Sequence, residues 1–258
     1  MSGHPGPGPA PSLIPAVPDQ SWLELFYDLA FAASIVVLSS TYSSYAGVGG
    51  VIWLGLVFSM IWSTWLSTTL MLGAGLVTTM WTRALLLTQM VLVLSVAITS
   101  DYSQQDHSAA VGPLFAAVLV TLALLYRSAR RSAPGLDVAY RGHATRCVVA
   151  SAVFLLVPFL GWPWWYPLLW IAGISVFMLP TRSQERRLPM DSHHVVHRFG
   201  EFTIIMLGEV FLKLGITASQ EPLDRVDLIG LPLAATVVFG GWWLYFTDVP
   251  AMGLSADH

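Results

Sequence analysis

Three ionisable residues interrupt an apolar run at residues 201–213, EFTIIMLGEVFLK. Glu201, Glu209 and Lys213 share this run with large apolar side chains that are typical of a membrane helix. Carboxylates at membrane depth are costly, usually face a bundle interior or a water-filled cavity, and mark ion pathways and proton relays. The run is therefore a candidate ion pathway. In it Lys213 either pairs with Glu209, one helical turn away, or extends outward to the membrane surface.

Two further carboxylates lie in the segment WLELFYDLAFAASIVVLSS, which begins at Trp22. Glu24 and Asp28 are four residues apart, so a helix places them on one face. At about 1.5 Å per residue, Asp28 lies about 9 Å beyond Trp22, inside the bilayer. We expect Asp28 to have a specific partner within the bundle. Glu24 is either a second member of the pathway or an interfacial carboxylate that the helix N-terminus stabilises.

Histidine and arginine precede the first run, in DSHHVVHRFGEF. His197 and Glu201 are one turn apart, which favours a proton-exchanging pair. A row of His193, His197 and Glu201 offers two nitrogens and an oxygen, but this spacing is not a specific metal signature, so no metal site is predicted. Arg198, beside the row, joins the candidate site. Two supporting residues complete the set, Arg83 as a partner for an acid and Asp248 as a polar residue at a helix end.

The elements that must position these residues are membrane helices. The chain has 258 residues, of which 55% are hydrophobic and only 10% charged, whereas a soluble domain has about 25% charged residues. We therefore predict an all-α, polytopic transmembrane bundle whose partner is the lipid bilayer. The net charge of −3 argues against nucleic acid, and the single cysteine, Cys147, excludes an intrachain disulfide and a cysteine metal cluster.

Eight apolar runs are long enough, or nearly so, to cross about 30 Å of hydrocarbon. They lie near residues 22–42, 48–70, 79–99, 109–127, 145–161, 164–181, 198–217 and 228–248. The motif GWPWWYP at 161–167 leaves two short spans or one re-entrant hairpin as alternatives, and two spans is our prediction. A transmembrane domain over 21–250 then lies between a disordered, Pro/Gly-rich tail at 1–20 and a short tail at 251–258.

The arginines predict the orientation. With eight spans, ten of the 12 Lys and Arg residues fall on one side, which the positive-inside rule assigns to the cytoplasm together with both termini. The loop at about 127–144 is predicted to be a basic connector on that side. The opposite loops hold Arg225 alone. The ten residues are Arg83, Arg127, Arg130, Arg131, Arg141, Arg146, Arg182, Arg186, Arg187 and Arg198.

The first and seventh spans can be aligned, which suggests an internal repeat. ELFYDLAFAASIVVLS matches HRFGEFTIIMLGEVFL, with Phe26 over Phe199 and Asp28 over Glu201, and each segment precedes a Trp-rich span. The offset of 173 residues covers six helices, so both copies would have the same orientation. The second copy would be incomplete.

These segments resemble the bacterial low temperature requirement A family. WLELFYDLAFAASIVVLSSTY is similar to its N-terminal signature, HRFGEFTIIMLGEVFLKLGI to its second signature, and FGGWWLYFTD to the segment that follows. The resemblance covers about residues 20–250 and implies an integral protein of the bacterial plasma membrane without a defined substrate. The matching motif positions are Glu24, Asp28, Arg198, Phe199, Gly200, Glu201, Gly208 and Glu209.

The chain departs from the family pattern in two ways. His197 stands where members usually have an acidic residue before Arg-Phe-Gly, and members tend to continue with further spans. We therefore expect a natural short form, a C-terminally truncated sequence, or a homo-oligomer that completes the bundle.

Three functional classes follow from these residues. The leading hypothesis is a transporter or channel for a proton, cation or small solute that uses intramembrane carboxylates. The alternative is a structural or regulatory membrane protein that transports nothing, with its acids paired to arginine or lysine. An intramembrane enzyme is the remote alternative, because GxSxG, HExxH and Gly-rich phosphate motifs are absent from the sequence. No cofactor is predicted.

Overall fold

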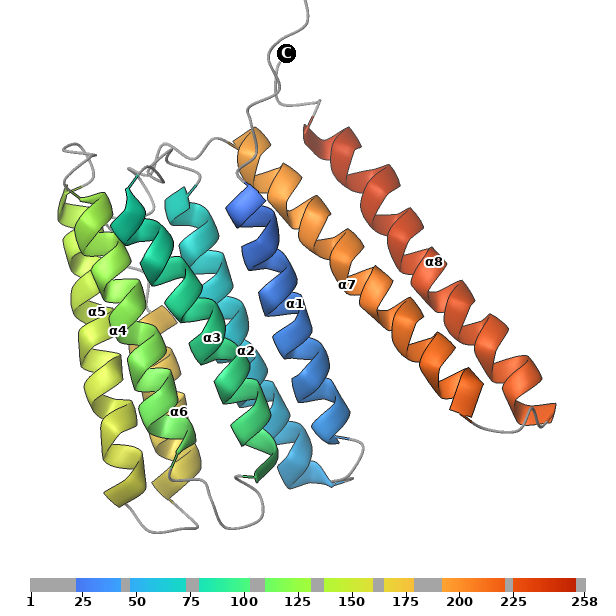
Figure 1. Ribbon diagram of the computed structural model, residues 1–258, viewed down its shortest axis with the longest axis horizontal. Coiled ribbons are helices and arrows are strands. Elements are labelled where there is room, and N and C mark those ends of the chain that lie inside the picture. The colour runs from blue at the N-terminus through green and yellow to red at the C-terminus, as the bar shows by residue number, and fades with distance from the viewer. Residues whose placement is uncertain are drawn as a thin grey trace, which may run out of the picture.

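The chain forms a bundle of helices in a computed structural model, which describes residues 22–42, 47–72, 79–102, 110–130, 137–159, 165–178, 192–220 and 225–253 (Figure 1). Within these residues there is no strand, and the predicted all-α class is confirmed. The helices are α1 (Trp22–Tyr42), α2 (Val48–Leu72), α3 (Met80–Tyr102), α4 (Val111–Ala129), α5 (Asp137–Leu156), η3 (Val157–Phe159), α6 (Trp165–Met178), α7 (Ser192–Gln220) and α8 (Arg225–Gly253).

Five of these helices are long and apolar enough to cross a membrane, namely α1, α2, α3, α4 and α8. The other α-helices are shorter or more polar. The described part of α6 has 14 residues, about 21 Å at the usual rise. α7 has 29 residues and carries the charged side chains of the candidate site. The predicted tail at 1–20 lies outside the described residues, and α8 continues to Gly253, beyond the predicted span end at 248.

The basic connector predicted at about 127–144 is wrong in its second half, because α5 begins at Asp137. An acidic residue in the first turn is stabilised by the helix dipole. The Asp137 carboxylate also pairs with Arg130, at the end of α4, and with Arg141, one turn further along α5. These interactions start the helix eight residues before the predicted span, in a segment that apolar content alone did not mark.

The helix α1 lies beside α2, α3 and α7, so it connects the two ends of the bundle. At one end α4, α5 and α6 pack around an aromatic core, in which Trp170 contacts Phe115 and Phe154 with ring centroids 5.1 and 5.0 Å apart. At the other end α7 packs on α1, and α8 packs on α7 at the edge (Figure 1). The helices α1 and α7 start at the same end of the bundle (Figure 1), so the two segments of the predicted repeat run in the same direction, side by side.

Candidate functional site

A buried ion pair joins α1 to α7. The Arg198 guanidinium donates through Nη2 to Oδ1 of Asp28, and the two side chains are 1% and 0% exposed. The same guanidinium is 3.8 Å from the Glu24 carboxylate and 3.5 Å from the Glu24 carbonyl oxygen. The structure therefore brings together three of the predicted site residues, since Asp28 and Glu24 share one face of α1 and Arg198 lies opposite them.

Trp65 of α2 is the second hydrogen-bond donor to Asp28, and it was not among the residues predicted from the sequence. Its indole Nε1 donates to Asp28 Oδ1 at 2.7 Å. The indole ring packs against Phe199 and Phe202 of α7, with centroids 5.0 and 4.4 Å apart. Phe199 belongs to the Arg-Phe-Gly motif, so that motif supplies both the cation and an aromatic ring that holds the Asp28 donor in place. The position of Trp65 well inside α2, rather than at its end, was the signal in the sequence that could have identified it.

The Arg198 guanidinium faces two carboxylates, Glu24 and Asp28, and it is closer to Asp28. Within the described residues, Asp28 Oδ2 and the Nε and Nη1 atoms of Arg198 are buried and have no hydrogen-bond partner. A buried charge without full hydrogen bonding is costly. The site therefore holds buried polar atoms without partners on both the carboxylate and the guanidinium.

A second polar cluster lies next to Asp28, between α1, α2 and α3. Tyr27 donates to Gln89 Oε1 at 2.8 Å, and Thr68 donates to the same oxygen at 3.2 Å. All three side chains are buried. Sequence reasoning missed Gln89, although an amide in the middle of an apolar span is itself a signal for an interhelical hydrogen bond. These two hydrogen bonds hold α2 and α3 against Tyr27, the residue that precedes Asp28 on α1.

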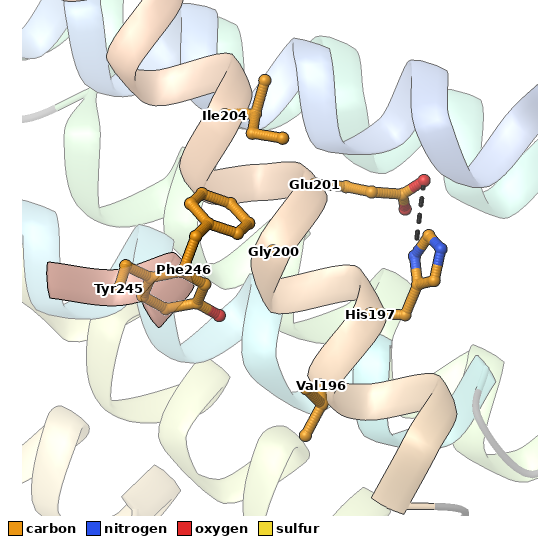
Figure 2. Close-up of a pocket in the computed structure, with 7 residues that line it drawn as sticks. All are labelled: Val196, His197, Gly200, Glu201, Ile204, Tyr245 and Phe246. Atoms are coloured by element: carbon orange, nitrogen blue, oxygen red, sulfur yellow. Dashed lines mark ion pairs between the residues drawn. The ribbon is translucent and has the colours of Figure 1, made fainter. Parts of the chain in front are cut away.

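His197 and Glu201 lie close together on α7, with His197 Nδ1 3.6 Å from Glu201 Oε1. That they exchange a proton stays a prediction. Both line a cavity of about 310 Å³ that Tyr245 and Phe246 of α8 also border. Figure 2 shows the two polar side chains directed toward each other, on the side of α7 away from the two α8 rings. Asp28 is not among the lining residues. The aligned acids Asp28 and Glu201 therefore occupy different environments, one closed and one open.

Lys213 does not pair with Glu209 in the structure. Its ammonium group donates to the Val36 carbonyl at 3.0 Å and to the Ser39 hydroxyl at 2.7 Å, both on α1. Glu209 is half-buried and makes no ion pair within the described residues. The predicted pair is wrong because Lys213 lies on the face of α7 toward α1, where polar oxygens are within reach. Lys213 and Arg198 thus fasten α7 to α1 at two depths.

Of the two supporting residues, Arg83 stays outside this arrangement. Arg83 is exposed at the start of α3, where its backbone N–H donates to the Thr79 carbonyl. Asp248 belongs to the last turns of α8, and its side chain lies outside the described residues.

Replacing Lys213 with methionine is expected to lower the free energy of unfolding by about 1 kcal/mol, a typical value for interhelical hydrogen bonds in membrane proteins. The change removes the ammonium group, and with it both hydrogen bonds to α1, while retaining an unbranched side chain. Thermal unfolding in detergent measures the loss of stability. Glu209→Gln, which breaks no ion pair on the same helix, is the matched control, and an equal shift in both variants would contradict the prediction.

Comparison with known proteins places the chain in a family. Residues 19–258 match the family model described as Bacterial low temperature requirement A protein (LtrA). The chain is 26% identical over 246 residues to a protein of Rhizobium meliloti (strain 1021) named Uncharacterized protein RA0937. The match covers 88% of this chain and 58% of the relative, so the chain spans little more than half of that protein's length. No solved structure matches.

Proposed function

Because the chain belongs to the bacterial low temperature requirement A family of membrane proteins, we propose that it conducts a proton or small cation by charge exchange at Asp28. The observation that carries the proposal is the buried contact of Asp28 with the Arg198 guanidinium, to which the partly exposed Glu24 presents a second carboxylate 3.8 Å away. Ionisable residues within membranes mark ion pathways. A buried ion pair is, in contrast, weak evidence for a stabilising role. We place the protein in the plasma membrane with both termini cytoplasmic.

Arg198 is the gating group in this proposal. It contacts Asp28 directly, and Glu24 lies 3.8 Å away. A proton or cation that binds Asp28 removes the attraction between Asp28 and Arg198, and the guanidinium then moves toward Glu24. Glu24 is 14% exposed, so it connects the closed pair to the surface of the bundle. The exchange needs only a small shift between α1 and α7.

Glu209 supplies the next polar position along α7. It lies about 16 Å beyond Arg198 at the usual helical rise, and the contact of Lys213 with Ser39 lies one turn further. His197 and Glu201 lie close together on α7 and line a cavity that Asp28 does not, so we assign this pair to proton exchange at the cytoplasmic entrance.

A second candidate is a static role, in which Arg198 and Lys213 hold α7 to α1 and nothing is transported. The observation in its favour is that both cations bind α1 at two depths. In this case Asp28 is a structural acceptor, and neutralising it changes stability without changing ion flux.

The deciding experiment is ion flux into liposomes that contain the purified protein. We expect the wild-type protein to dissipate an imposed proton or sodium gradient, and Asp28→Asn to reduce this flux to the rate of protein-free liposomes. Asp137→Asn, the same chemical change at the exposed ion pair between α4 and α5, should conduct like the wild type. If the wild type moves neither ion, or Asp28→Asn conducts normally, the proposal fails and the static role stands.

A further inference from the structure

A groove of about 310 Å³ lies between α4 and α5, at the far end of the bundle from α7 and α8. Three arginines line it at the end where α4 stops and α5 starts. They are Arg127, Arg130 and Arg141. Neither the ion path nor the motifs of α1 and α7 use any of them, so their presence together at one groove is unexplained by the proposed function.

The charge of the groove is positive even after its ion pairs are counted. Asp137 accepts from both Arg130 and Arg141, and Arg127 makes no ion pair within the part of the chain that the structure describes. Three arginines against one aspartate leave a formal charge of +2. An anion with several oxygens is the ligand that such a set of guanidinium groups prefers.

Tyr140 also lines the groove. It is only 1% exposed, and its hydroxyl is buried without a hydrogen-bond partner among the described residues. Buried polar atoms normally have a partner, so this residue of the groove lacks an acceptor.

Below the arginines the walls of the groove become apolar. Leu124 is one turn deeper than Arg127 on α4, and Val148 lies about 10 Å deeper than Arg141 on α5. These two side chains are 37% and 55% exposed, and Ala123, Ala144 and Thr145 also line the groove. The Thr145 hydroxyl donates to the Arg141 carbonyl within α5. The groove thus changes from cationic to apolar along the direction that crosses the membrane. A free anion would contact only the arginine-lined end of the groove.

We propose that this groove binds an anionic membrane phospholipid. Arg127 and Tyr140 donate to its phosphate group, and one acyl chain lies along Leu124 and Val148. Basic pockets between helices on the cytoplasmic side of a membrane are suited to anionic headgroups, and the arginine-rich end of α4 and α5 is the side predicted to be cytoplasmic. The inference depends on the membrane location and is independent of whether the protein conducts ions.

The test compares lipids in the thermal unfolding of the purified protein in detergent. Phosphatidylglycerol should raise the unfolding temperature in a saturable way, whereas phosphatidylcholine with the same acyl chains should not. Arg127→Gln should weaken the apparent affinity for phosphatidylglycerol about fivefold, as expected for the loss of one basic residue near a membrane surface. Arg83→Gln, the same change at an exposed arginine of α3, should bind like the wild type.

One further variant and two further ligands test whether the apolar wall and the acyl chain contribute to binding. Leu124→Trp fills the apolar wall from an exposed position, so it should fold and also weaken lipid binding. Inorganic phosphate and glycerol phosphate carry the anion without the acyl chain, and should leave the unfolding temperature unchanged. The proposal is overturned if Arg127→Gln and Leu124→Trp both bind phosphatidylglycerol like the wild type, if phosphatidylcholine binds equally well, or if phosphate alone reproduces the stabilisation.

Discussion

Replacing Arg198 with methionine is expected to lower the free energy of unfolding by about 3–5 kcal/mol, because the change leaves the Asp28 carboxylate buried without its cation. Asp28 is fully buried and receives one further donor, the Trp65 indole. A single neutral hydrogen bond does not compensate a carboxylate in a low-dielectric interior. Unfolding in a single detergent, monitored by tryptophan fluorescence, measures the loss.

The double variant Asp28→Leu with Arg198→Met distinguishes the cost of an unpaired charge from the worth of the pair. Replacing both members of a buried ion pair by apolar residues is often neutral or stabilising, so the double variant should recover most of the stability. Arg83→Met, at the exposed start of α3, is the control for losing an arginine. If Arg198→Met is as stable as Arg83→Met, then Asp28 is not held as a carboxylate by Arg198.

The same double variant also separates folding from conduction. It should fold but lack both groups that the proposed charge exchange requires. A folded double variant that still dissipates the gradient would show that the ion takes another route, for instance past Glu201 and the cavity beside α8.

Replacing Trp65 with alanine is expected to be similarly severe, lowering the free energy of unfolding by about 3–5 kcal/mol through the cavity that it creates. Trp65 is fully buried, and its ring contacts Phe199 and Phe202 of α7. Trp65→Phe retains an aromatic ring but removes the donor to Asp28, which costs about 1.5–3 kcal/mol for a hydrogen bond to a charged group. The two variants therefore separate packing from hydrogen bonding.

Trp62→Phe is the control for this second prediction. Trp62 lies in the same aromatic cluster, with its ring centroid 5.7 Å from that of Phe202, but it does not contact Asp28. If Trp65→Phe and Trp62→Phe unfold at the same temperature, the indole hydrogen bond contributes nothing measurable. In that case Trp65 acts by packing alone.

The sequence was sufficient to predict the helical class, because long apolar runs are a local property of the chain. The depth of Asp28 in the membrane, which follows from the helical rise after Trp22, stays a prediction. The partner of Asp28 could not be derived in the same way. Arg198 is 170 residues away, and its contact depends on how α7 rotates against α1.

Rotation about a helix axis also explains the errors. The four-residue spacing of Glu209 and Lys213 made an ion pair between them plausible, but it gave no information on the oxygens that α1 offers to Lys213. Similarly, the start of α5 at Asp137 depends on ion pairs with Arg130 and Arg141, which an apolar pattern does not contain. Trp65 and Gln89 were missed because a tryptophan and an amide on their own do not show which helix they contact.

The separation of Asp28 from Arg198 along the chain has a consequence for biogenesis. At roughly 5–20 residues per second, ribosomes need about 10 to 30 s to synthesise the intervening 170 residues. During that interval α1 has no Arg198 to pair with Asp28, which lies six residues after the start of the helix. Trp65 emerges much earlier and already offers a donor to Asp28. We therefore expect the hairpin of α1 and α2 to shelter the carboxylate until α7 is inserted.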